Sequence, residues 1–251
     1  MSSLEADLRF AHALADAADA ITLARFRALD LLVETKPDLS PVSEADRAAE
    51  EAIRALVSRG RQGEGVLGEE QGDDGGGGET RWIVDPIDGT MNYVRGIPVW
   101  GTLLALERGG EVEVALVSAP ALGRRWWALR GEGAWAAGER CRVSQVARLE
   151  DCTVSTTSPR EMPAGWTELT SRAWATRGLS DFWQHCLVAE GALDIATDSV
   201  VNLWDFAAIR LLVEEAGGRC TTFEGAPPEH GRSLVSTNAH VHDAACELLG
   251  R

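Results

Sequence analysis

A nine-residue segment in the first half of the chain carries the residue types needed for metal-ion chemistry. Residues 82–90 read WIVDPIDGT, an apolar run that ends abruptly in carboxylates and a hydroxyl. The pattern predicts a buried strand followed by a tight turn, which Pro86 stiffens because its ring fixes φ. Asp85 and Asp88 can both reach one hard cation, with the carbonyl oxygen of Ile87 as a further ligand. An all-oxygen ligand set suits Mg²⁺, Mn²⁺ or Ca²⁺ and not Zn²⁺.

A second segment, Val66-Leu67-Gly68-Glu69-Glu70, repeats the order of apolar strand, glycine and carboxylates. A purely structural explanation exists for the first motif, since an Asx turn after a strand needs only Asp and Gly. For an isolated Asp-x-x-Asp-Gly pattern, that explanation is the more common one. The two segments together favour a site that binds a cation.

Two further aspartates lie where helices are expected to begin. Asp205 would sit near the start of an amphipathic helix, where its charge is favourable, and for this residue taken alone a simple N-cap is the commoner role. Asp46 follows Ser43 at the spacing of a capping box, with Ser as the N-cap and an acid at the third helical position. A structural role does not exclude a functional one, because a capped helix start is a rigid place for a catalytic acid.

Helices and loops are expected to dominate the beginning of the chain. Apolar residues at helical spacing predict a long first helix over residues 3–34, and Ser43 opens a second helix. Residues 35–41, with two prolines, are expected to form a polar loop. The glycine-rich residues 73–78 are expected to form a flexible surface loop.

The middle of the chain favours an antiparallel sheet. Residues 98–107 and 112–118 are predicted to be two strands of a hairpin, with 124–129 as the next strand. Trp126 and Trp127 are expected to place one ring on each face of that sheet, although they could also contribute to a dimer interface.

Strands and helices alternate after residue 137. We expect a strand near 154, a helix over 181–190, a strand over 193–197, a helix over 204–216, strands over 219–223 and 233–236, and a final helix from 239. Such alternation predicts α/β layering. The chain is therefore expected to form two stacked halves, residues 1–136 and 137–251, that make one compact unit with a site between them.

The composition limits the possible partners. The 251 residues carry 24 Lys+Arg and 39 Asp+Glu, a formal net charge of −15. This charge argues against nonspecific binding of nucleic acid or of anionic membranes. A phosphorylated substrate remains compatible, because bound divalent cations reverse the local sign.

Cysteine usage and the N-terminus bear on the cellular compartment. The chain has five cysteines and no Cys-x-x-Cys pair, so we expect reduced thiols in the cytoplasm. Glu5 and Asp7 interrupt the N-terminal segment, and no signal peptide is expected. No apolar run approaches ~20 residues, so no membrane-spanning helix is expected. Five scattered histidines are expected to be structural or exposed: His12, His185, His230, His240 and His242.

Taken together, these motifs resemble the inositol monophosphatase family, Mg²⁺-dependent and lithium-sensitive phosphomonoesterases. The resemblance rests on residues 82–90 with Gly-Glu-Glu before them, on Ser43–Asp46, and on Trp204-Asp205-x-Ala207-Ala208 followed by Glu215–Gly218. It implies the αβαβα layered sandwich that this family shares with the fructose-1,6-bisphosphatases. It also implies a homodimer and a small phosphorylated metabolite as substrate.

The resemblance implies a role for each residue of these motifs. The metal ligands would be Glu69, Asp85, Ile87, Asp88 and Asp205. Glu69, Asp85 and the Ile87 carbonyl would hold one Mg²⁺, the three aspartates a second, and a weaker third site would lie near Glu69, with Mn²⁺ as a substitute. Thr90 and Asp46 would orient and deprotonate a water, and Glu69 would complete the catalytic set. The backbone N–H groups of Gly89 and Thr90 would cradle phosphate oxygens.

Other segments resemble one branch of the family, the actinobacterial histidinol-phosphatases. These are Asn92–Trp100, Ser118–Trp127, and Asp181-Phe182 together with Leu187–Ala192. L-histidinol phosphate carries an ammonium group, which carboxylates in the pocket would pair with. Trp100 or Tyr93 could stack on its imidazole, although buried packing is their commoner role.

The predicted substrate-binding residues combine the metal motifs with this branch. They are Asp88, Gly89, Thr90, Arg177, Asp181, Asp198, Asn202 and Asp205. Arg177 could contact phosphate or hold Asp181. Asn202 stands where many inositol-type members carry His, which weakens an inositol preference.

Two other functions compete with a histidinol-phosphatase. One is an inositol-1-phosphate or broad sugar-phosphate phosphatase of the same family. The other is a non-catalytic interaction protein, which the complete set of expected metal ligands disfavours.

Overall fold

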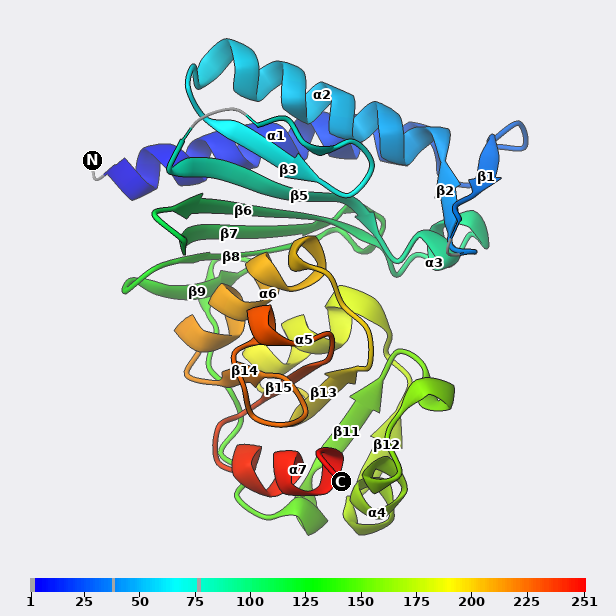
Figure 1. Cartoon of the computed structure of the whole chain (residues 1–251), viewed down its shortest axis with the longest axis vertical. Coiled ribbons are helices and arrows are strands. Elements are labelled where there is room, and N and C mark those ends of the chain that lie inside the picture. Colours follow the sequence, from blue (N-terminus) through cyan, green and yellow to red (C-terminus); the bar gives the residue numbers. More distant parts are fainter. Residues whose placement is uncertain (1–2, 38, 76–77) are drawn as a thin grey trace.

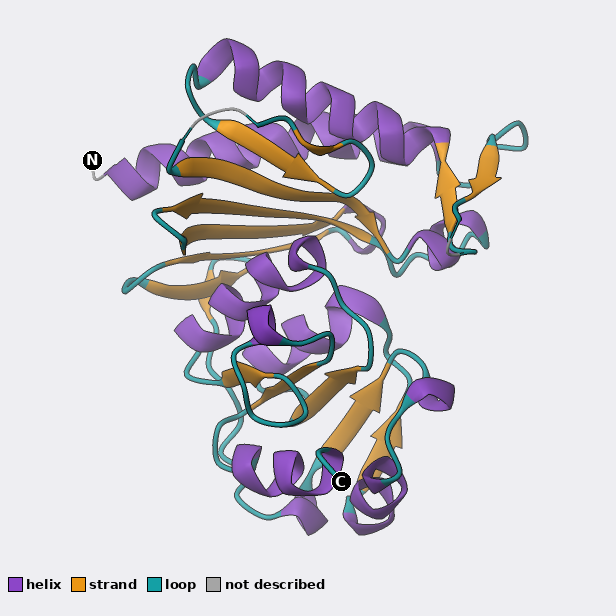
Figure 2. Ribbon diagram, viewed as in Figure 1, coloured by secondary structure: helices purple, strands orange, loops and turns teal. Residues whose placement is uncertain are grey.

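Five layers of helix and sheet alternate in the computed structural model, which describes residues 3–37, 39–75 and 78–251 (Figures 1 and 2). The helices are α1 Ser3–Arg25, α2 Glu44–Gly60, α3 Thr90–Val94, α4 Gly165–Arg172, α5 Asp181–Ala189, α6 Leu203–Glu215 and α7 His242–Leu249. Among the helices in these ranges, none has the length and apolar character to cross a membrane.

The strands form two large sheets and a small hairpin. The eight-stranded sheet contains β3 Gly65–Gly68, β4 Gly72–Asp73, β5 Thr80–Asp88, β6 Gly101–Arg108, β7 Glu111–Ala119, β8 Arg124–Leu129, β9 Gly133–Ala136 and β10 Glu139–Arg140. The five-stranded sheet contains β11 Thr153–Thr156, β12 Ala175–Arg177, β13 Ile195–Asp198, β14 Arg219–Thr221 and β15 Leu234–Thr237. The hairpin pairs β1 Val33–Thr35 with β2 Pro41–Ser43.

The layers follow from which faces are apolar. Helices α1 and α2 cover one face of the eight-stranded sheet, and α5 and α6 fill the space between the two large sheets. Helices α4 and α7 cover the outer face of the five-stranded sheet. Side chains alternate along β5, so Trp82 and Val84 face α1 and α2 while Ile83 faces α5 and α6. The αβαβα arrangement predicted from the sequence is thus confirmed.

The predicted hairpin and strand in the middle of the chain are present. Strands β6 and β7 pair antiparallel across the turn at residues 109–110, and β8 spans the predicted residues 124–129. Trp126 belongs to the core beside α5 and α6, whereas Trp127 packs against the core beneath α1 and α2. The expectation of one ring on each face of the sheet is therefore confirmed.

The prediction that the first helix runs to residue 34 is wrong. The helix ends at Arg25, and Leu29 and Leu32, which continue the helical spacing, are exposed. Arg27 adopts φ 63°, and its guanidinium donates to the Gly96 carbonyl oxygen at 2.7 and 3.0 Å. A contact to a residue so far along the chain leaves no signal in local periodicity.

Several element boundaries also differ from the prediction. The polar loop predicted over residues 35–41 connects the hairpin strands β1 and β2, and its residue 38 lies outside the described residues. The predicted glycine-rich loop begins within β4, and its residues 76–77 are likewise outside the described residues. Strand β6 begins at Gly101 instead of residue 98, and the last helix begins at His242 instead of residue 239.

Buried His242 predicts a pH-dependent stability. Its ring nitrogens contact the hydroxyls of Thr237 at 2.9 Å and Thr221 at 3.0 Å. Burial, and then the charge of Arg219, lowers the pKa of His242 to about 4 from an ordinary value of 6.5. The unfolded chain therefore binds an extra proton between these values, and stability present above pH 6.5 is lost as the pH falls toward 4. We expect protonation of this histidine alone to lower the free energy of unfolding by about 2 kcal/mol between pH 7 and pH 5.

Urea unfolding of the wild type and of His242→Gln at both pH values measures this contribution. The glutamine keeps an amide in place of the ring but does not titrate. Between pH 7 and pH 5, the variant should lose about 2 kcal/mol less of its free energy of unfolding than the wild type. An equal loss in both proteins would contradict the assignment.

Candidate active site

A bulge in β5 turns two carboxylates to the same side. Asp85 is opposite Leu103 of β6 and Asp88 is opposite Gly101, so β5 contains one more residue than β6 over this stretch. In a regular strand, residues three apart face opposite sides of the sheet, and the additional residue cancels that alternation. The Asp85 carboxylate also accepts the N–H of Ile87 at 3.0 Å, which fixes the turn.

Asp205 reaches the same place from the second half of the chain. It is the third residue of α6 and not its N-cap, which is Asn202. One carboxylate oxygen of Asp205 accepts the backbone N–H of Asn202 at 2.7 Å, the geometry of a capping box. Oxygen atoms of Asp85, Asp88 and Asp205 all lie within 4.8 Å of one another, so each can contribute one ligand to a single metal ion.

Asp46 and Thr90 form a hydrogen-bonded pair beside this cluster. Asp46 is fully buried at the start of α2, and one of its oxygens accepts the Ser43 backbone N–H at 2.8 Å. The other oxygen accepts the Thr90 hydroxyl at 3.1 Å. The Thr90 hydroxyl is also 2.9 Å from the Ile87 carbonyl oxygen, a predicted metal ligand. The capping box predicted for Ser43 and Asp46 is confirmed, and the same aspartate also contacts Thr90.

Glu69 lies at the edge of the cluster, paired with the single lysine of the chain. The ammonium of Lys36 is 2.7 Å from Glu69 and 2.6 Å from Glu70. Burial opposes the charge of Lys36, but the hydrogen bonds to these two carboxylates raise its pKa above the ordinary value. Burial raises the pKa of Glu70 to about 7.

The electrostatics of the cluster fit a bound divalent cation. Burial, and then the charges of Glu69, Asp88 and Asp205, raises the pKa of Asp85 well above its usual range. Burial raises the pKa of Asp88 in the same way, aided by Asp181 and Asp205. The pKa of Asp205 rises to about 7, first through burial. Three crowded carboxylates, with oxygen as the only donor atom, suit Mg²⁺ or a similar hard cation.

A small pocket of about 90 Å³ opens beside these carboxylates, between the two halves of the chain. Its lining residues are Asp88, Thr157, Asp181, Phe182, His185, Asp198, Val200, Val201, Asp205 and Leu234. The Asp181 carboxylate accepts from the Asn92 amide at 2.8 Å and from the Ser180 hydroxyl. Burial raises the pKa of Asp181 to about 6. The pocket therefore gathers four carboxylates from both halves.

The remaining predicted substrate-binding residues are not among those that line this pocket. Gly89 adopts φ 83° as the N-cap of α3, and a Cβ there would lie 3.0 Å from the Val99 carbonyl oxygen. The following residue, Thr90, begins α3, so the N–H groups predicted to cradle phosphate lie in its first turn. Asn202 is exposed at the start of α6. Arg177 is exposed on the edge strand β12, where its guanidinium contacts the carbonyl oxygen of Thr176, whereas Asp181 contacts Asn92 and Ser180.

Two aromatic residues that could have stacked on a substrate are instead part of the core. Tyr93 and Trp100 are buried and pack edge to face, with ring centroids 4.9 Å apart. Conversely, sequence reasoning missed His185 as a residue that lines the pocket. It lies on the predicted helix 181–190, but without a fold nothing in the sequence pairs it with Asp198.

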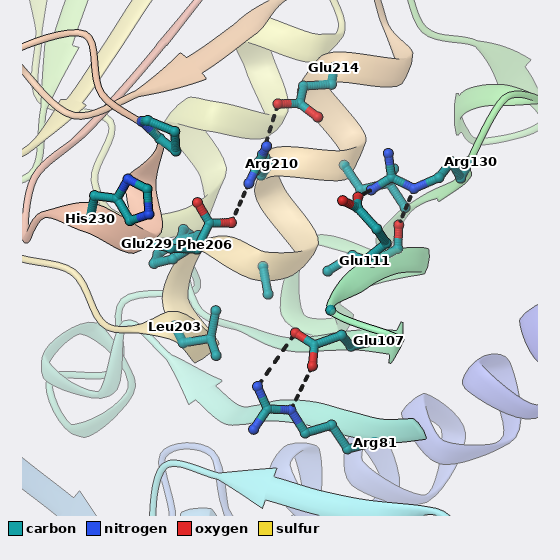
Figure 3. Close-up of a pocket in the computed structure, with 15 residues that line it drawn as sticks. Arg81, Glu107, Glu111, Arg130, Leu203, Phe206, Arg210, Glu214, Glu229 and His230 are labelled. Atoms are coloured by element: carbon teal, nitrogen blue, oxygen red, sulfur yellow. Dashed lines mark hydrogen bonds and ion pairs between the residues drawn. The ribbon is translucent and has the colours of Figure 1, made fainter. Parts of the chain in front are cut away.

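A separate cleft of about 500 Å³ lies along another face of α6, away from Asp205 (Figure 3). Its floor includes Phe206 and Leu203, and its charged groups are paired with one another. The pairs are Arg81 with Glu107 at 2.9 Å, Arg130 with Glu111 at 3.2 Å, and Arg210 with Glu214 at 2.9 Å and with Glu229. Only the pair of Arg210 with Glu229 joins α6 to another segment, and the paired charges leave no free carboxylate cluster among these residues. The grouped like charges of the smaller pocket therefore mark that pocket as the chemical site.

The chain is similar to known proteins over nearly its whole length. The inositol monophosphatase family profile matches residues 3–250. A histidinol-phosphatase of Streptomyces coelicolor is 50% identical, over 97% of this chain and 96% of its own length. A histidinol-phosphatase of Mycobacterium tuberculosis is 49% identical, over 98% of this chain and 97% of its own length. The solved structure of a Thermotoga maritima IMPase matches with a TM-score of 0.90 at 32% identity, covering 97% of this chain and 96% of that one.

Proposed function

The chain belongs to the inositol monophosphatase family, and we propose that it is an Mg²⁺-dependent phosphomonoesterase that hydrolyses L-histidinol phosphate to L-histidinol and phosphate. The observation that carries this proposal is the convergence of Asp85, Asp88 and Asp205 at a pocket that contains two further carboxylates. The near full-length similarity to two proteins named histidinol-phosphatase supports the choice of substrate.

The proposed metal site takes its ligands from the residues predicted in the sequence, three of which lie together in the structure. Glu69, Asp85 and the Ile87 carbonyl would hold one cation, and Asp85, Asp88 and Asp205 a second, with a weaker third near Glu69. Mn²⁺ is a plausible substitute for Mg²⁺, because both accept carboxylate and carbonyl oxygens. When bound, such cations supply Lewis acidity toward water and toward phosphate oxygens.

The protein's own groups would then direct the attack. Thr90 orients a water in line with the ester bond, and Asp46 takes up its proton through the Thr90 hydroxyl. The phosphate would lie against the N–H groups of Gly89 and Thr90. The water oxygen bonds to phosphorus as the ester P–O bond breaks. The ester oxygen then takes a proton from a second water to leave as the alcohol, and the proton held by Asp46 returns to solvent. No covalent phosphoenzyme is needed in this route.

The substrate's amine would be recognised by carboxylates that hold no metal. Of the four carboxylates that line the pocket, Asp88 and Asp205 are assigned to the cations, which leaves Asp181 and Asp198. Both would pair favourably with an ammonium group. Asn202 and Arg177 remain proposed contacts at the rim, since both are exposed.

An inositol-1-phosphate or broad sugar-phosphate phosphatase is the second candidate. Similarity in fold and sequence to the Thermotoga maritima IMPase favours it. Both candidates share the metal site and differ only in how the alcohol portion of the ester is bound.

The proposed cellular role follows from the substrate. We place the enzyme in histidine biosynthesis, in the cytoplasm, as a homodimer. The first half, residues 1–136, would supply most metal ligands. The second half, residues 137–251, would supply Asp205 and the specificity residues. Light scattering of the purified protein would test the dimer, and a monomeric mass at assay concentrations would refute it.

Phosphate release from L-histidinol phosphate and from myo-inositol 1-phosphate, each with Mg²⁺ and with EDTA, tests the function. We expect an Mg²⁺-dependent preference for L-histidinol phosphate of at least about tenfold in kcat/KM, lost in EDTA. Equal or greater turnover of the inositol ester would keep the metal chemistry and overturn the substrate. Absence of turnover with either ester would contradict the proposal.

A further inference from the structure

One buried histidine connects the floor of the pocket to the core behind it. His185, on α5, is buried, and its Nε2 lies 2.7 Å from a carboxylate oxygen of Asp198. Its Nδ1 lies 2.7 Å from the hydroxyl of Ser236 on β15. Ser236 is itself buried, and its hydroxyl lies 3.1 Å from the thiol of Cys220. The chain of contacts therefore runs from the pocket into the core of the second half.

The chemistry of these groups fixes the direction of the first hydrogen bond. A carboxylate only accepts, so Nε2 of His185 carries the proton that lies between it and Asp198. In the neutral ring, Nδ1 then accepts the Ser236 hydroxyl proton, and the Cys220 thiol can donate to the Ser236 oxygen. Both ring nitrogens are thus occupied, which fixes the ring orientation.

Asp198 receives further support from the residue before the histidine. The amide nitrogen of Gln184 lies 3.0 and 3.1 Å from the two oxygens of Asp198. Asp198 also shares the pocket with the carboxylates of Asp88, Asp181 and Asp205, which repel it. N–H donors behind it offset this repulsion and hold its oxygens in one orientation.

We infer that His185 is a positioning residue that aims the Asp198 carboxylate at the ammonium group of the substrate. A neutral polyol ester does not need a fixed anion at this point, whereas an amine does. The inference rests on the proposed function, because it concerns how that substrate is selected. Although His185 also lines the pocket, both of its ring nitrogens are occupied by Asp198 and Ser236, so it acts through Asp198 and does not take part in phosphate transfer.

A pair of substrates that differ only at the amine tests this role. L-histidinol phosphate and its N-acetylated derivative carry the same phosphate and imidazole, but acetylation removes the positive charge. In the wild type we expect kcat/KM to favour the free amine by at least about tenfold, as for hydrogen bonds to charged groups. The acetyl group also adds bulk, but its steric effect is common to the wild type and the variants. Comparing the ratio of the two kcat/KM values between proteins therefore removes that effect.

Three variants separate positioning from general damage. His185→Met fills the buried space without an N–H, and we expect its ratio to fall at least about fivefold below the wild-type ratio, mainly through a higher KM for the free amine. His185→Gln can place an amide N–H where Nε2 lies, and should keep the ratio within about threefold of the wild type. Val188→Ala removes core packing on the same helix without touching Asp198, and should leave the ratio unchanged.

The outcomes distinguish this inference from the proposed function. A wild-type ratio near one, or an unchanged ratio in His185→Met, would overturn the role of His185 while leaving the enzyme a histidinol-phosphatase. Lack of turnover of L-histidinol phosphate by the wild type would overturn both. An equal fall of the ratio in Val188→Ala would assign the effect to packing and also overturn the inference.

Discussion

Replacing Asp88 with Asn is expected to lower phosphate release by at least about a hundredfold, because one charge is lost from the three-carboxylate cluster that would hold the cations. The substitution should leave the local fold intact. The Asp88 carboxylate accepts the backbone N–H of Phe182 at 2.6 Å, and the side-chain oxygen of Asn can accept the same bond. The loss should therefore be one of metal binding and not of folding.

Three measurements separate these effects. Phosphate release should stay low in an Mg²⁺ titration, and calorimetry should show weaker Mg²⁺ binding. Thermal unfolding in EDTA should be unchanged or shifted upward, because removing one of several crowded like charges relieves repulsion. Asp243→Asn is the control, an aspartate exposed on α7 whose loss should alter none of them. Near wild-type turnover at saturating Mg²⁺ would refute the metal role of Asp88.

Replacing Thr90 with Ala is expected to lower kcat by about a hundredfold while KM changes by less than about threefold. The Thr90 hydroxyl is the only side-chain group that contacts both the buried Asp46 carboxylate and the Ile87 carbonyl among the described residues. Its loss removes the proton path to Asp46 but leaves the carboxylate cluster in place. An interaction made mainly in the transition state lowers kcat more than it weakens binding.

Thr90→Ser is the matched control, since it keeps the hydroxyl and removes only a methyl group. It should retain kcat within about fivefold of the wild type. A rise in KM with unchanged kcat in Thr90→Ala would assign the hydroxyl to substrate binding instead. Comparable losses in the Ser and Ala variants would point to a packing role.

Local features of the candidate site could be predicted because they depend on neighbouring residues. Ser43 and Asp46 form the expected capping box. Asp205 lies near the start of α6 as expected, although the structure shows it as the third helical residue, in a capping box with Asn202, and not as the N-cap. In both cases the hydrogen bonds span three residues, so residue type and spacing are enough to specify them. The apolar run before Asp85 likewise predicted the buried strand β5.

Features that depend on distant contacts could not be predicted. The spacing of Leu29 and Leu32 continued a helical pattern, but the chain leaves the helix at Arg25 and Arg27 binds the Gly96 carbonyl. His185 was expected to be structural or exposed, and it is buried, lines the pocket and contacts Asp198. The end of the first helix and the place of His185 beside the pocket share a cause, since each depends on a partner that periodicity does not identify.

The sequence by itself determined the layered fold class, the residue types of the metal motifs and the family that they resemble. Only the tertiary structure decided which carboxylates meet. The bulge in β5 turns Asp85 and Asp88 to one side, and the packing of α6 between the two sheets brings Asp205 to them. Hydrogen bonds within one turn are specified by adjacent residues, whereas convergence of separate segments depends on how the layers pack.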